Sequence, residues 1–182
     1  QDYPAAVQAL EELLTDPTLD DYFLAAPGQE DSQVSVKALG MQLLGTLPTA
    51  AKQLYETQVG HEARRRLNEA LAARDVVALS EVARRYVHTK AGYEASFLLG
   101  RVELDQGRTL AAALQLQPLC EQAGARELLD PELSVLTATA WNYSRRPDKA
   151  IEVLVALKWR TPRVKIRLRD GEEPLFDREE DA

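Results

Sequence analysis

The stretch of residues 93–124, YEASFLLGRVELDQGRTLAAALQLQPLCEQAG, decides the fold of this chain. Apolar residues recur at helical spacing in both halves, and the polar segment 105–108, with Gly107, separates them. Two amphipathic helices joined by a short turn cannot bury both apolar faces by themselves. The stretch therefore predicts a helical hairpin that stacks against similar hairpins on either side.

Small residues recur at a fixed period along the chain. Ala78, Ala112 and Ala150 occupy matching places in three second helices, and the first two are 34 residues apart. This period is typical of tetratricopeptide repeats. The central hairpin resembles that repeat at Leu99, Gly100, Gly107 and Ala112, where the repeat keeps a Leu-Gly pair, a turn glycine and a small inter-helix residue.

The predicted fold is all-α, a right-handed stack of antiparallel helical hairpins of tetratricopeptide-like character with about nine helices. Repeat-like hairpins are expected at residues 61–87, 93–122 and 131–159, and four earlier helices at 3–14, 35–45, 48–60 and 61–73, the last shared with the first hairpin. Gly60 is expected to end a helix, residues 125–129 to form a loop, and residues 20–31 to form a loop that packs through Tyr22, Phe23 and Leu24. Within the central hairpin, Gly100 and Ala112 are expected to face each other.

After Pro162 the pattern changes from helical to alternating. Val164, Ile166 and Leu168 alternate with four cations, namely Arg163, Lys165, Arg167 and Arg169. A turn at Asp170 and Gly171 then predicts a short C-terminal β-hairpin, expected to lie against the last helices near Trp159 or to be loosely ordered. The cations either protect an edge strand and meet Glu172 and Glu173, or form a docking surface for a partner.

The domain prediction is a helical-repeat domain at residues 1–162, followed by the β-hairpin and an acidic tail at 163–182. The sequence starts with Gln1 and ends in acidic residues with no closing element. We therefore expect it to be part of a longer protein with a further C-terminal region.

Composition limits the possible functions. The 182 residues are 45% apolar and 28% charged, with a net charge of −7, which argues against general affinity for nucleic acid or an anionic membrane. No apolar run approaches the roughly 18 residues of a membrane span. The lone Cys120 cannot form an internal disulfide.

The sequence contains no recognised catalytic pattern, whether phosphate loop, dinucleotide fingerprint, nucleophile elbow or zinc spacing. His61 and His88 are expected to be structural or at the surface, and Cys120 to act as a small apolar residue. The basic clusters 64–66, 84–85 and 145–146 spread around their helices, which favours solvated faces, with an anion-binding groove as the alternative. We assign no catalytic, cofactor-binding or metal-binding residue and expect no enzyme activity.

Residues 36–119 resemble the N-terminal helical module of secreted or envelope-associated planctomycete-type bacterial proteins. The resemblance rests on three runs, residues 83–86, 88–89 and 91–95, together with Asp105 and Gly107. In that group the module precedes a β-propeller of the pyrroloquinoline-quinone-binding-like kind. The resemblance implies a periplasmic or envelope location and places the propeller and any quinone site outside this chain, so no cofactor is assigned here.

The function expected is that of a non-catalytic protein–protein interaction or scaffolding module, which presents the concave face of the stack to a peptide or protein. The alternative is a supporting or regulatory domain, packed on a downstream β-propeller enzyme or redox domain of the same protein and without a ligand of its own.

Overall fold

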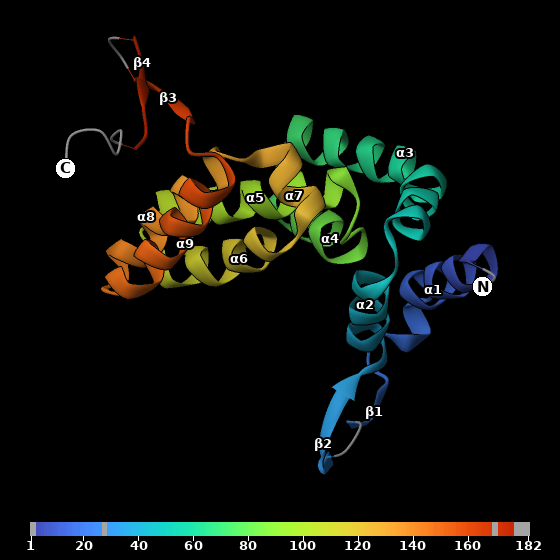
Figure 1. Cartoon of the computed structure of the whole chain (residues 1–182). Helices are drawn as coiled ribbons and strands as arrows, with labels where there is room; N and C mark the ends of the chain where they lie inside the picture. The colour runs from blue at the N-terminus through green and yellow to red at the C-terminus, as the bar shows by residue number, and fades with distance from the viewer. Residues whose placement is uncertain (1–2, 27–28, 169–170, 177–182) are drawn as a thin grey trace. The chain divides into compact units, whose positions relative to one another are not determined.

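The computed structural model describes residues 3–26, 29–168 and 171–176. Nine α-helices lie in these ranges: α1 (Tyr3–Thr15), α2 (Val36–Thr46), α3 (Thr49–Ala73), α4 (Val76–Arg85), α5 (Lys90–Asp105), α6 (Thr109–Glu121), α7 (Ala123–Leu129), α8 (Glu132–Tyr143) and α9 (Pro147–Arg160). The shorter elements are the 3-10 turn η1 (Pro17–Leu19) and the strands β1 (Phe23–Ala26), β2 (Gln29–Ser35), β3 (Lys165–Leu168) and β4 (Gly171–Pro174). The predicted all-α class with a short C-terminal β-hairpin is confirmed (Figure 1).

The chain forms two compact units, Gln1–Ala95 and Ser96–Ala182. In the first unit, α1 packs on α2 and α3, and α3 and α4 form a helical hairpin. Its largest fully buried side chains are those of Tyr55, Leu44, Leu67 and Val7. Arg74, with φ of 53°, ends α3 in the left-handed conformation, and the Asp75 carboxylate then accepts the N–H groups of Val77 and Ala78 to begin α4.

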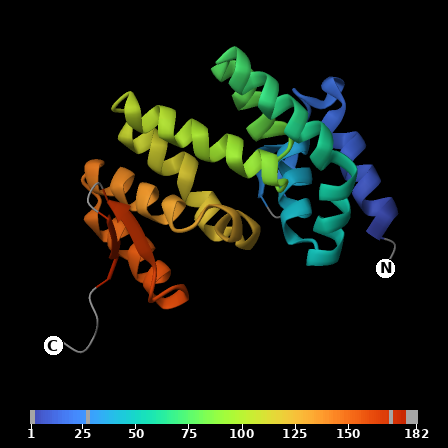
Figure 2. The ribbon, with the colours of Figure 1, turned by 90° about the horizontal axis from the view of Figure 1, so that it is seen from above.

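The second unit is built around α8, which packs against both α6 and α9. In Figure 2 the antiparallel α8 and α9 lie side by side in orange. Leu116, Leu133 and Leu157 are fully buried, one from each of the three helices. The Trp141 indole N–H donates to Gln117 Oε1 at 2.8 Å, which adds a polar link between α8 and α6.

The prediction that Gly60 ends a helix was wrong. The predicted helices 48–60 and 61–73 are the single helix α3, and Gly60 is buried inside it. A helix ends at glycine when that residue takes the left-handed conformation, whereas Gly60 continues the helix and the end comes at Arg74. Residues 125–129, predicted as a loop, lie in α7.

The predicted loop at 20–31 contains most of a second β-hairpin, formed by β1 and β2. Tyr22, Phe23 and Leu24 are exposed there, so their predicted packing on the helices was wrong. A two-stranded ribbon has little surface with which to cover its own side chains.

The C-terminal hairpin forms where it was predicted, after α9 has ended at Arg160. Its antiparallel register pairs Lys165 with Pro174 and Arg167 with Glu172. Trp159 remains 84% exposed, so the hairpin does not cover it as expected. The domain bounds 1–162 and 163–182 stay a prediction.

Candidate functional site

The predicted repeat positions lie mostly inside the helical hairpins. Ala112 and Ala150 are buried, Leu99 is half-buried, and Ala78 lines a cavity of about 270 Å³ between α3 and α4. Gly107 takes a φ of 75° in the turn between α5 and α6, where a residue with a side chain would be strained. These positions therefore shape the scaffold and do not form a site.

Gly100 lies against Leu116 and not against Ala112 as predicted. A β-carbon added at Gly100 would come 2.5 Å from the Leu116 side chain, and its three nearest atoms all belong to that leucine. Leu116 lies four residues, about one helical turn, after Ala112 on α6. The small residue thus makes room for a large one across the helix contact.

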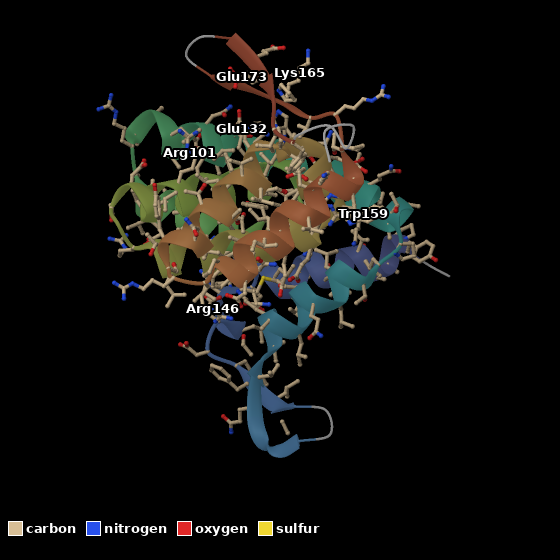
Figure 3. The ribbon with its side chains drawn as sticks, turned by 60° about the vertical axis from the view of Figure 1, so that its left-hand side comes forward. Arg101, Glu132, Arg146, Trp159, Lys165 and Glu173 are labelled. Carbon is tan, nitrogen blue, oxygen red and sulfur yellow. The ribbon has the colours of Figure 1, made fainter. Side chains whose placement is uncertain are left out.

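The predicted docking strand is only partly described. Arg163 and Lys165 are exposed, whereas the side chains of Arg167 and Arg169 lie outside the described residues. Figure 3 shows Lys165 and Glu173 on the two arms of the hairpin. The register places Arg167 opposite Glu172, in line with the interpretation of an edge strand whose cations meet the acids across the turn.

The sequence analysis missed an apolar stripe along α9. Ile151, Val155 and Trp159 are spaced by four residues and are 60%, 47% and 84% exposed. The opposite face of α9 carries the buried residues Ala150, Val153 and Leu157. A helix that is apolar around most of its circumference is normally covered on more than one side, and this signal was readable in the sequence. We call Ile151, Val155 and Trp159 the α9 stripe.

Charged pairs border the α9 stripe. Lys149 Nζ lies 2.8 Å from Glu152 Oε2 on α9 itself. Arg160 Nη2 lies 3.1 Å from Asp130 Oδ2, before α8. An apolar centre with a rim of both charge signs is the usual anatomy of a protein-binding surface. On α6, Leu110 and Leu114 are also exposed, again four residues apart.

Residues 83–95, which carried the family resemblance, form the junction between α4 and α5. Thr89 is buried; its hydroxyl donates to the Tyr86 carbonyl at 2.7 Å and accepts the Gly92 N–H at 3.0 Å. Burial raises the pKa of Tyr93 to about 12. This part of the motif therefore has a structural explanation.

His88 also has a structural position. It is 8% exposed, and its Nε2 lies 3.0 Å from the Met41 carbonyl oxygen on α2. Its ring meets Tyr93 edge-on at 6.4 Å. His61, in contrast, is exposed on α3.

The basic clusters are largely neutralised. Arg65 pairs with Glu62 and Glu69, and Arg66 also pairs with Glu62. Arg146 pairs with Asp148 at 2.9 Å. These contacts support solvated, ion-paired faces. Arg85 differs, because its buried Nε has no hydrogen-bond partner in the described part of the chain.

No arrangement suited to catalysis emerges from the described residues. Cys120 Sγ donates to Thr137 Oγ1 at 3.3 Å, and burial raises the pKa of the thiol, which disfavours the reactive thiolate. Across the described ranges, no group of three or more His, Cys, Asp or Glu residues is placed to hold a metal ion.

Comparisons of the chain with protein-family models, with curated proteins and with solved structures found no match. None of the helices in the described ranges combines the length and apolar composition needed to cross a bilayer. The tetratricopeptide-like character and the planctomycete resemblance stay predictions from the sequence.

Proposed function

We propose that this chain is a non-catalytic protein–protein interaction or scaffolding module of a larger bacterial protein, and that the α9 stripe is its main contact surface. The observation that carries the proposal is the exposure of Ile151, Val155 and Trp159 in one row on a well-packed helix. Contiguous exposed apolar side chains mark interaction surfaces more often than chance exposure does.

The chemistry of the stripe defines the partner surface. Branched aliphatic side chains and a tryptophan gain free energy when an apolar surface covers them. Tryptophan is also among the residues that dominate binding energy at interfaces. The partner is therefore expected to present an apolar helix or groove with charges at its edge, complementary to the Lys149–Glu152 pair.

Site-specific photo-crosslinking in the cell that makes the protein tests the proposal. A benzophenone amino acid replaces Val155 in one variant and Val77, which is 72% exposed on α4, in the control. We expect position 155 to give one dominant cross-linked product and position 77 to give none. Adding Ile151→Glu and Trp159→Glu should remove the product formed from position 155.

Mass spectrometry of that product separates the two roles. A peptide from another protein supports the interaction module, and a peptide from a downstream part of the same polypeptide supports the supporting-domain alternative. Equal, diffuse cross-linking from positions 155 and 77 contradicts both roles for the α9 stripe.

A further inference from the structure

A second feature lies in the N-terminal unit and does not depend on the α9 stripe. A cavity of about 200 Å³ lies between the end of α1, η1, the first turns of α2 and the end of α4. Three cationic side chains line it, those of Lys37, Arg84 and Arg85, against one acidic side chain, that of Asp20. This local positive excess contrasts with the chain's net charge of −7.

Arg85 is the strongest indication that the cavity binds something. Its Nε is buried and has no hydrogen-bond partner among the described residues, and leaving a buried charged donor unpaired is unfavourable. The guanidinium carbon lies 5.8 Å from the centre of the Tyr86 ring, so the ring helps to hold the group in place. A fixed guanidinium presents parallel N–H donors that match the oxygens of an anion.

The first turn of α2 adds further donors. Ser35, Lys37 and Ala38 line the cavity, and the Ser35 side chain makes no capping hydrogen bond to the helix that it precedes. The first N–H groups of a helix have no acceptor within the helix and carry partial positive charge. A helix start of this kind, beside cationic side chains, is well suited to an oxyanion.

We propose that this cavity binds a tetrahedral oxyanion, either inorganic phosphate or the phosphate group of a small phosphomonoester. Arg85 and Lys37 supply the charge, and the N–H groups at the start of α2 supply directed donors. The cavity is smaller than the roughly 300–1,000 Å³ of pockets for drug-sized molecules, so the phosphate group itself fills most of it.

Asp20 acts in this proposal as an internal counterion. Its Oδ1 accepts a hydrogen bond from Lys37 and lies 3.9 Å from Arg84 Nη1. The hydrogen bond from Lys37 lowers the pKa of Asp20, which keeps the carboxylate ionised. The carboxylate therefore holds the two cations when no ligand is bound and repels an incoming anion. Removing its charge should strengthen phosphate binding.

Titration of the full chain with inorganic phosphate, followed by calorimetry at constant ionic strength in chloride, tests the proposal. Arg85→Gln and Lys37→Gln should each weaken binding at least tenfold, and Asp20→Asn should strengthen it at least threefold. Arg65→Gln is the matched control, because it removes one positive charge from α3 outside the cavity and should leave the affinity unchanged. Glycerol phosphate and acetate are titrated in parallel, the first to separate a phosphomonoester from free phosphate and the second to test for carboxylates.

Three results would overturn the proposal: no phosphate binding at millimolar concentration, equal weakening by Arg65→Gln and Arg85→Gln, or acetate binding as tight as that of phosphate. Circular dichroism checks that each variant is folded. If Arg85→Gln does not fold, Lys37→Gln and Asp20→Asn decide, and unchanged affinity in both overturns the assignment.

Discussion

Gly92 lies directly against the main-chain carbonyl of Tyr86. A β-carbon added at Gly92 would come 2.0 Å from the Tyr86 oxygen and 2.6 Å from its carbonyl carbon. The obstacle is backbone, so it cannot turn aside as the end of a long side chain can. The same oxygen accepts hydrogen bonds from the hydroxyl and the N–H of Thr89, which fix it in place. Only glycine fits at this crossing between α4 and α5.

Gly92→Ala should therefore destabilise the N-terminal unit. Alanine normally stabilises a helix by about 1 kcal/mol over glycine, but overpacking against a fixed neighbour costs about 1–3 kcal/mol and occasionally more. We expect the clash to outweigh the gain in helix propensity and the free energy of unfolding to fall. Urea denaturation followed by circular dichroism measures the change.

Gly60→Ala is the matched control for this substitution. Gly60 is also a buried helical glycine, but a β-carbon there would meet the Glu56 carboxylate at 2.7 Å, the far end of a flexible side chain. Because Glu56 can move away, the alanine should leave stability unchanged or raise it by up to about 1 kcal/mol. Equal losses in both variants would mean that the Tyr86 carbonyl is not the cause.

A double-mutant cycle tests the contact between Gly100 and Leu116. Gly100→Ala should cost about 1–3 kcal/mol because its new β-carbon overlaps the leucine. Leu116→Ala alone should cost about 2–5 kcal/mol, since Leu116 is fully buried. The double variant should lose less than the sum of the two, because the smaller residue at 116 relieves the overlap. Additive losses would contradict the contact.

Ala112→Leu tests the neighbouring position on α6. Ala112 is fully buried, so the larger side chain should overpack the hairpin and cost about 1–3 kcal/mol. Ala111→Leu, at an exposed position one residue earlier, serves as the control and should change stability little. Thermal unfolding of both variants compares them directly, and an unchanged melting temperature for Ala112→Leu would contradict the burial.

Local sequence signals predicted most of the helices well. Asp75 was placed at a turn and caps α4, and Gly107 was placed at a turn and takes the positive φ that favours glycine. Gly60 misled the prediction because a glycine can end a helix or allow close packing within one. Only the surrounding structure distinguishes these two uses, and here Gly60 is buried within α3.

The candidate sites were harder to predict because they depend on residues distant in sequence. His88 reaches the Met41 carbonyl across 47 residues, and Lys37 reaches Asp20 across 17. The cluster 84–85 showed two cations side by side, but not that Arg85 Nε is buried without a partner. For α9 the apolar circumference was visible, whereas the face left uncovered was set by how α8 packs.

Thr89→Ala should destabilise the junction between α4 and α5. The hydroxyl accepts the Gly92 N–H and donates to the Tyr86 carbonyl, so its removal leaves two buried backbone groups without partners. Loss of such a helix-capping residue costs about 0.5–2 kcal/mol. Thr89→Ser keeps the hydroxyl and should retain most of the stability. Equal losses in the two variants, measured by urea denaturation, would show that the hydroxyl bonds do not contribute.

The Glu62 carboxylate should make stability depend on pH in a defined acidic range. Hydrogen bonds from Arg65 and Arg66 lower its pKa from 4.5 to about 2. A lowered folded-state pKa means that the stabilisation is fully present above pH 4.5 and is lost as the pH falls towards 2. Glu62→Gln lacks the titrating group, so wild type should lose more stability than this variant over that range, and the two should converge near pH 2. Glu81→Gln, which removes an exposed carboxylate without an ion pair in the described structure, is the control. Denaturation midpoints between pH 2 and 7 measure the difference, which should shrink in 1 M NaCl because salt screens exposed charges. A constant difference between wild type and Glu62→Gln at every pH would contradict the predicted linkage.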